Sequence, residues 1–177
     1  LQNAGHRGIP QIVAPGAADL IDWPTWQAMP TKWCSRPIHV HNKLISSLTM
    51  NLEERKLLAH AMAQRLNAAK GPVHVILPLK GVEAWDRESE VAHAPEDLAG
   101  FLETLRNELD QQVATTVTNC HINDPGFVEA ALMVLDGWLA AGVVTGLALL
   151  LWRAISSLPW HFARRRWGFG SRAMNVA

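Results

Sequence analysis

Three polar residues in the second half of the chain have side chains suited to chemistry. They lie in the segment His121-Ile122-Asn123-Asp124-Pro125. Imidazole titrates near neutral pH, so His121 could transfer a proton or ligate a metal. Asn123 can both donate and accept hydrogen bonds, and Asp124 could act as a base, bind a metal or cap a following helix. We expect a functional loop here, with His121 as the best catalytic candidate, His121 and Asn123 contacting a ligand, and Asp124 capping the helix.

A second candidate loop ends the run Leu77-Pro78-Leu79-Lys80-Gly81. Lys80 could neutralise a phosphate or a carboxylate, and Gly81 would let the backbone approach a ligand closely. The alternative is an exposed turn lysine. The chain contains neither GxxxxGK[ST] nor GxGxxG, so this loop is not one of the standard phosphate-binding motifs.

A third candidate loop contains Pro15, Gly16 and Asp19. Backbone N–H groups in such a tight turn can hold an anion, although a plain strand-to-helix turn has the same composition. The segment His39-Val40-His41-Asn42 places two histidines on one face of a strand, but no third metal ligand is nearby, so we predict no metal site. His41 and Asn42 are better candidates for a polar contact to a ligand.

Alternating strand and helix patterns position these loops. Strands are predicted at Gly8–Ala14, Val73–Leu77 and Val113–Cys120, and helices at Leu52–Ala69, Pro95–Leu109 and Gly126–Ala141. This order predicts an α/β fold with an open, mostly parallel, Rossmann-like sheet flanked by helices. Ligands of such sheets bind outside the carboxyl ends of the strands, where all three loops would meet.

Local signals add detail to this outline. Asn51 is a predicted N-cap, and the helix after it carries a predicted apolar stripe of Leu57, Leu58, Ala61, Met62, Arg65 and Leu66. Leu98, Phe101, Leu102 and Leu105 should point inward from the next helix. Ala17–Ile21 is predicted as a short turn or helix, Ile38–His41 as a short strand, and the proline-rich segment Asp22–Pro37 as an extended loop whose tryptophans pack back on the domain.

Composition narrows the class of protein. The 177 residues include 16 Lys+Arg and 16 Asp+Glu, so the formal net charge is zero and gives no reason to expect nucleic acid as a partner. Two cysteines form no disulfide framework, which favours a reducing, cytoplasmic setting.

The last part of the chain has a different character. Residues 1–142 form the predicted α/β subdomain, whereas 143–177 form a tail that is first apolar and then basic. Val143–Trp152 is almost wholly apolar, which predicts a C-terminal helix packed either on a missing part of the protein or on a partner. A membrane span through 143–160 is the less favoured alternative, since spans need about 20 apolar residues. The tail could also differ from the native end of the domain.

Several segments together resemble the Tm-type ATP-binding family, named for the tomato mosaic virus resistance protein. The resemblance covers about Gly5 to Val144 and rests on Gly8–Val13, Pro15-Gly16, Asp19, His39–Asn42, Glu53-Glu54, Leu77–Val82 and His121–Phe127 in this order. One departure is Thr49, which stands where the family usually has an arginine and weakens a phosphate-binding argument at that loop.

The resemblance implies a second subdomain. Family members have two α/β subdomains, and this chain, which starts at Leu1, would be a fragment lacking the N-terminal one. ATP is the implied ligand, with Mg²⁺ as a candidate companion, and a homo-oligomer is expected. The ligand-binding candidates are Gly16, Asp19, His41, Asn42, Lys80, Gly81, His121, Asn123 and Asp124. Two alternatives remain open: a hydrolase or transferase acting on a phosphorylated small molecule, and an interaction or membrane-associated protein using its tail.

Overall fold

The computed structural model describes residues 1–144, and its centre is a parallel sheet. The sheet consists of β1 (Gln11–Val13), β5 (Val73–Pro78) and β6 (Ala114–Thr118), in the order β1-β5-β6. β5 is central and pairs in parallel with both neighbours. Its β-branched residues suit a strand that is covered on both faces, and the predicted open, parallel α/β sheet is confirmed.

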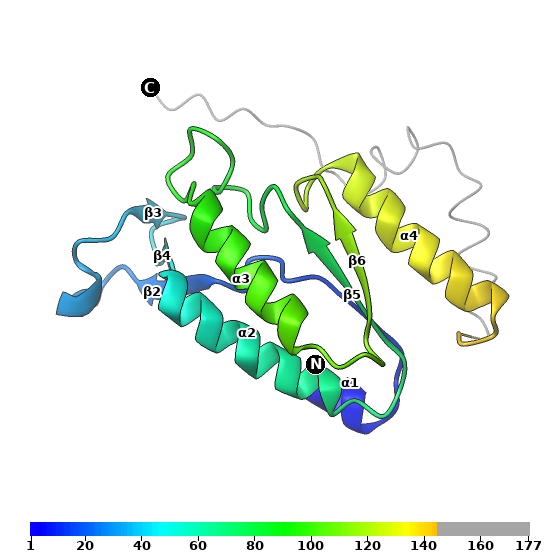
Figure 1. The fold of residues 1–177 in the computed structure, drawn as a ribbon. Helices are drawn as coiled ribbons and strands as arrows, with labels where there is room; N and C mark the ends of the chain where they lie inside the picture. Colours follow the sequence, from blue (N-terminus) through cyan, green and yellow to red (C-terminus); the bar gives the residue numbers. More distant parts are fainter. Residues whose placement is uncertain (145–177) are drawn as a thin grey trace. The chain divides into compact units, whose positions relative to one another are not determined.

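Helices connect these parallel strands. α2 (Leu52–Asn67) precedes β5, α3 (Pro95–Glu108) joins β5 to β6, and α4 (Pro125–Ala140) follows β6. α2 and α3 run side by side and cover the same face of the sheet (Figure 1). A short helix, α1 (Gln2–His6), lies at the amino end of the chain.

The core lies between this helix pair and the sheet. Phe101 and Leu105 on α3 and Val75 on β5 are completely buried. Full burial of a large apolar side chain contributes about 1.5–3 kcal/mol to stability. All four residues of α3 predicted to point inward belong to this core: Leu98, Phe101, Leu102 and Leu105.

The N-terminus of α2 has the predicted cap. The side chain of Asn51 accepts a hydrogen bond from the Glu54 N–H at 2.9 Å, and the Glu54 carboxylate accepts one from the Asn51 N–H at 3.1 Å. The predicted apolar stripe of this helix is partly wrong. Leu57 is 68% exposed, whereas Arg55 is buried together with Met62 and other residues of the inner face.

A second, antiparallel sheet was not predicted. It contains β2 (Leu20–Pro24), β4 (Ile45–Thr49) and β3 (Ile38–Val40), in the order β2-β4-β3. The expected turn or helix at 17–21 and the expected loop at 22–37 are therefore wrong where β2 runs. A short 3₁₀ turn, Thr31–Trp33, lies between β2 and β3.

The tryptophans before β3 behave differently from one another. Trp23 and Trp33 pack edge to face with ring centroids 5.6 Å apart, whereas Trp26 is 68% exposed. Trp26 therefore does not pack back on the domain.

The chain divides into two compact units, the first of which is Leu1–Gly137. The second begins at Trp138, and the predicted apolar C-terminal helix and basic tail extend past residue 144, outside the described residues. Within residues 1–144 we find no helix with the length and apolar character needed to cross a bilayer.

Candidate functional site

Three strand-end loops meet at the carboxyl edge of the parallel sheet. The Ala17 N–H donates to the Val82 carbonyl at 2.8 Å, which joins the loop after β1 to the loop after β5. The Ile122 N–H donates to the Gly81 carbonyl at 3.0 Å, which joins the loops after β5 and β6. Parallel strands with helical crossovers bring their carboxyl ends to one edge, and this is the placement that the sequence pattern predicts.

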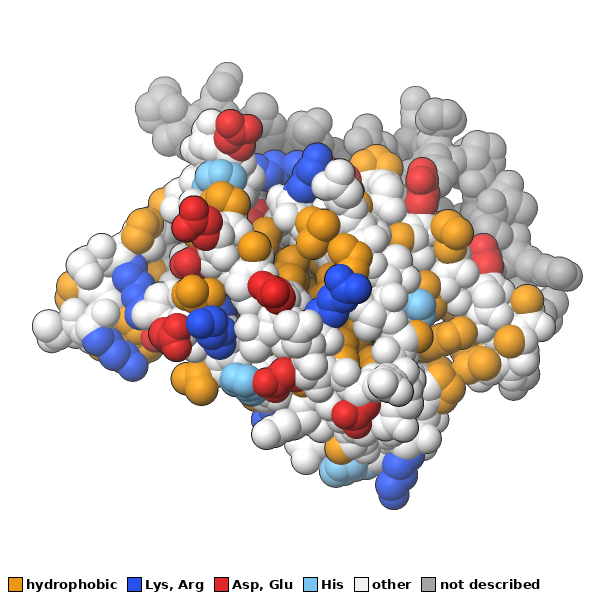
Figure 2. All heavy atoms as spheres, viewed as in Figure 1, with side chains coloured by type: hydrophobic (Ala, Val, Ile, Leu, Met, Phe, Trp, Pro, Cys, Tyr) orange, Lys and Arg blue, Asp and Glu red, His pale blue; other side chains and the backbone are white. Residues whose placement is uncertain are grey.

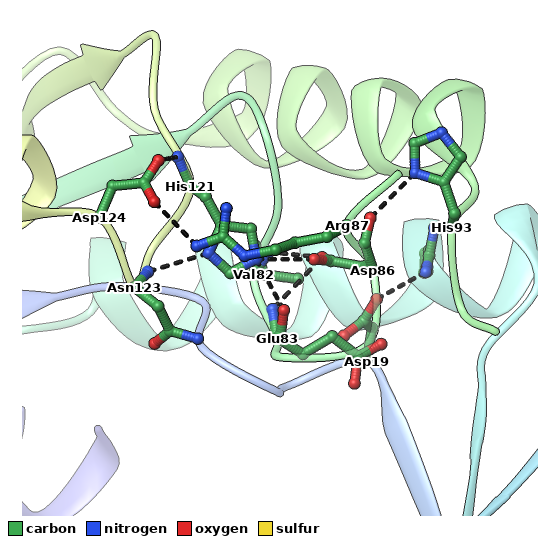
Figure 3. Close-up of polar contacts among 10 residues, drawn as sticks. Asp19, Val82, Glu83, Asp86, Arg87, His93, His121, Asn123 and Asp124 are labelled. Atoms are coloured by element: carbon green, nitrogen blue, oxygen red, sulfur yellow. Dashed lines mark hydrogen bonds and ion pairs between the residues drawn. The ribbon is translucent and has the colours of Figure 1, made fainter. Parts of the chain in front are cut away.

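His121 is the internal link between two of these loops. The side chain is 1% exposed, and its Nδ1 accepts a hydrogen bond from the Asn123 N–H at 3.0 Å. The ring proton therefore lies on Nε2, which donates to the Glu83 carbonyl at 2.7 Å and to Asp86 Oδ1 at 2.9 Å (Figure 3). Both ring nitrogens are engaged, so this geometry gives the neutral imidazole a positioning role.

Gly81 is required by the closeness of this imidazole. A Cβ at position 81 would overlap the His121 ring and the Asp86 carboxylate. The backbone φ of +141° is, in addition, one that side-chain-bearing residues rarely adopt. Gly81 therefore lets the loop after β5 pass directly against His121, a role different from the predicted approach to a ligand.

Both oxygens of the Asp86 carboxylate accept hydrogen bonds from other groups of the protein. Its Oδ2 accepts from the N–H groups of Val82 at 2.6 Å and Glu83 at 3.2 Å. With Oδ1 bound to His121, Asp86 fixes the first turn of the long loop that connects β5 to α3.

Asp124 is held in a similar way. Its Oδ2 accepts from the His121 N–H at 2.9 Å, and its Oδ1 pairs with Arg87 at 2.8 Å. The hydrogen bond from Arg87, followed by that from the His121 backbone, lowers the pKa of the Asp124 carboxyl. The side chain thus turns back towards its own loop and ties it to the loop that carries Arg87.

A buried ion pair lies beneath the loops. Arg55 Nη2 is 2.8 Å from Asp19 Oδ2, and their side chains are 2% and 0% exposed. Burial raises the pKa of Asp19, an effect that the charge of Arg55 opposes. Sequence reasoning missed Arg55, although it shares a helical face with Ala59, Met62 and Leu66 at spacings of four, seven and eleven residues.

Glu83 is a third buried carboxyl of this region, after Asp19 and Asp86. It is 4% exposed, and neither side-chain oxygen has a hydrogen-bond partner among the described residues. Burial, reinforced by the negative charges of Asp19 and Asp86, raises the pKa of Glu83 to about 8. The side chain is therefore mostly protonated at neutral pH.

A pocket of about 560 Å³ opens beside these groups. Lys80 and Arg87 line it from the loop after β5, and Arg55 lines it from α2. Ala94 and Pro95, where α3 begins, also line it. Basic and acidic side chains are interspersed on the face of the molecule shown in Figure 2, so any attraction for an anion must be local to such a pocket.

The remaining predicted contacts lie outside this pocket. Asn42 Oδ1 accepts from the Leu44 N–H at 2.7 Å and the Ile45 N–H at 3.1 Å, which makes it a turn residue. His41 packs edge-on against Trp85, with ring centroids 5.7 Å apart.

Gly16 and Asn123 are both exposed and are likewise not among the residues that line the pocket. Of the predicted ligand-binding residues, Lys80, His121 and Asp124 line it. Residues 1–144 contain no cluster of three or more His, Cys, Asp or Glu side chains that could hold a metal ion.

A parallel sheet with a pocket at its carboxyl edge defines a Rossmann-like α/β domain. Residues 1–139 match the C-terminal domain of an uncharacterised protein family, UPF0261. The match covers most of the chain, and this protein belongs to that family.

Individual relatives agree with this assignment. A UPF0261 protein of Brucella melitensis is 44% identical over 144 residues, which are 81% of this chain and 34% of the relative. A UPF0261 protein of Clostridium tetani is 32% identical over 73% of this chain and 32% of its own length. The tomato ToMV resistance protein Tm-1(GCR237) is 32% identical over 71% of this chain and 17% of its own length. The chain thus spans about a third of the bacterial relatives that it matches.

Proposed function

We propose that this domain binds the phosphate groups of a nucleotide in the pocket beside Lys80, and that the nucleotide is ATP, as the family resemblance implies. The observation that carries the proposal is that Lys80 lines this pocket unpaired within residues 1–144, while two of the pocket's carboxylates are engaged and a third, Glu88, is exposed. Asp86 and Asp124 are both engaged by donors of the protein. The ammonium group of Lys80, in contrast, has no partner among the described residues and lies at the end of β5.

The size of the pocket and its backbone elements support a phosphate ligand. Its volume of about 560 Å³ is in the range of small-molecule sites. Helix N-termini favour anions because their first N–H groups lack helical acceptors, and α3 begins at this pocket with no side-chain cap from Ala94. Lys80 would add a positive charge that can meet one phosphate.

Mg²⁺ would bind in this site mainly through the phosphate groups of the ligand. Mg²⁺ in nucleotide sites is usually held by phosphate oxygens and water with one or two carboxylates, so it needs no cluster of protein ligands. A second wall of the cleft would come from the remainder of the full-length protein, which we propose to be the N-terminal subdomain.

Isothermal titration of ATP into the full-length protein tests this proposal. Loss of a charge-assisted contact typically costs about 1.5–3 kcal/mol, so Lys80→Ala should weaken binding by roughly tenfold or more. Lys70→Ala is the matched control, because Lys70 is an exposed lysine in the turn after α2, is not among the pocket-lining residues, and its loss should leave the affinity unchanged. Absence of ATP binding by the unmodified protein would refute the nucleotide proposal, and equal affinity in Lys80→Ala would remove Lys80 from the site.

A further inference from the structure

The wall of the pocket contains a buried guanidinium whose hydrogen bonds are only partly used. Arg55 lines the pocket, and its side chain is 2% exposed. Nη2 pairs with Asp19, but Nε and Nη1 have no hydrogen-bond partner among the described residues. Buried charged donors without acceptors are costly, so a guanidinium kept in this state beside a pocket points to an acceptor that arrives with a ligand.

The N-terminus of α3 is a second, independent anion-favouring feature of the same pocket. α3 has 14 residues, Ala94 supplies no side-chain cap, and Pro95 at its start lines the pocket. Its first-turn carboxylates, Glu96 and Asp97, are not among the pocket-lining residues. The helix dipole adds to the positive potential near Arg55, and the first-turn carboxylates offset part of this contribution.

We propose that Arg55 is the deep anion receptor of this pocket and binds a phosphate group of the ligand. Asp19 is the positioning residue that holds the guanidinium in place. The inference rests on the proposed phosphate-binding function, and it moves the principal contact from the exposed Lys80 to a residue that is buried. Lys80 then guides the ligand at the rim of the pocket.

The chemistry of the surrounding groups supports this division of roles. A guanidinium has five N–H donors and stays charged at any physiological pH, so pairing with one carboxylate still leaves donors for phosphate oxygens. The raised pKa keeps Glu83 mostly uncharged at neutral pH, which limits the negative charge next to Arg55. Asp86 is saturated by two backbone N–H groups and His121.

The direct test is a titration with inorganic phosphate, followed through the arginine Nε–H signals in proton–nitrogen correlation spectra of the full-length protein. The Arg55 signal is assigned by its loss in Arg55→Lys. We expect this signal to shift saturably with phosphate, while the signal of Arg65, an exposed arginine on the same helix, stays in place. An Arg55 signal that does not move at any phosphate concentration would overturn the inference.

Affinity provides a second measurement. Arg55→Lys should weaken phosphate binding at least tenfold, because lysine keeps the charge but lacks the fork of N–H donors of a guanidinium. Arg65→Lys should leave the affinity for phosphate unchanged. Thermal melting checks that Arg55→Lys remains folded. If it does not, triple-resonance spectra of the unmodified protein assign the Arg55 signal through its backbone, and its response to phosphate decides the matter. If ATP binds and depends on Lys80 while Arg55 stays unshifted, this inference fails alone. If phosphate shifts Arg55 but ATP does not bind, the nucleotide proposal fails alone.

Discussion

At the scale of single residues, Gly81 and His121 depend on each other, because the backbone at Gly81 lies directly against the His121 ring. The loop after β5 passes so close to the His121 ring that no side chain fits at position 81. His121 in turn holds the backbone of Glu83 and the carboxylate of Asp86. The pocket therefore depends on a small, closely packed set of contacts beneath its surface.

Gly81→Ala should destabilise the protein markedly. The added methyl group overlaps His121 and Asp86, and the backbone at φ +141° is strained for alanine, so we expect a loss of about 2–4 kcal/mol in the free energy of unfolding. Gly137→Ala is the control, because it meets no atom within 4 Å and should change stability by less than about 1 kcal/mol. Equal urea midpoints for the two variants would contradict this view of Gly81.

Glu83 should make stability depend on pH. The pKa of Glu83 in the folded protein is about 8, against an ordinary value of 4.5, so between these values the folded state holds a proton that the unfolded state has released. Stability contributed by this group is therefore lost as the pH rises from about 5 to 8. Glu83→Gln should be more stable than the unmodified protein at pH 8, by on the order of 2 kcal/mol, with a smaller difference at pH 5. Parallel urea titrations at both pH values check this, and a constant difference would refute it.

Residue types in the sequence predicted three of the side chains that line the pocket but not the contacts that these side chains make. Lys80, His121 and Asp124 were expected near a ligand and do line the pocket. The buried position of His121 depends on Asp86, which is 35 residues away in sequence, so spacing alone could not reveal that both ring nitrogens are engaged.

At the scale of elements, helix α2 shows how a buried charge changes the register of an apolar stripe. Arg55 lies on the inner face of α2, where it forms an ion pair with the buried Asp19. Leu57, two residues further along the helix, is exposed to solvent. The predicted stripe did include an arginine, but it was Arg65, which is exposed, and not the buried Arg55. Helical periodicity alone does not show which arginine has a buried partner.

Two identical substitutions on α2 test this register. Leu66 is 1% exposed within the core, so Leu66→Ala should cost about 2–5 kcal/mol of unfolding free energy. Leu57 is 68% exposed, and Leu57→Ala should change stability by no more than about 0.5 kcal/mol. Urea-induced unfolding of both variants measures the contrast. A larger loss for Leu57→Ala would mean that this face of α2 is covered.

The sheet β2-β4-β3 could not be predicted from local patterns. Its middle strand buries Ser46 and Ser47, and the Ser47 hydroxyl donates to Asp22 on β2 at 2.6 Å. Burial of serine pairs gives no apolar alternation, and the prolines of the preceding segment favour a loop. Only the long-range pairing between strands reveals this sheet.

At the scale of the whole domain, the alternation of strands and helices along the chain was the most predictable feature. Alternating strands and helices were sufficient to place three loops on one sheet edge, and their mutual hydrogen bonds confirm that placement. The shape of the pocket was not predictable, because the irregular segment 82–94 forms much of its wall and has no periodic pattern.

Hydrogen exchange of the full-length protein with and without ATP tests the central claim, that a phosphorylated ligand binds at this sheet edge. Bound ligand should slow exchange severalfold in peptides covering residues 79–95 and 119–124, because their backbone amides surround the pocket. Peptides from residues 22–33, which do not line the pocket, should exchange at the same rate with and without ATP. Protection confined to other parts of the protein, with none in 79–95 or 119–124, would contradict the proposed site.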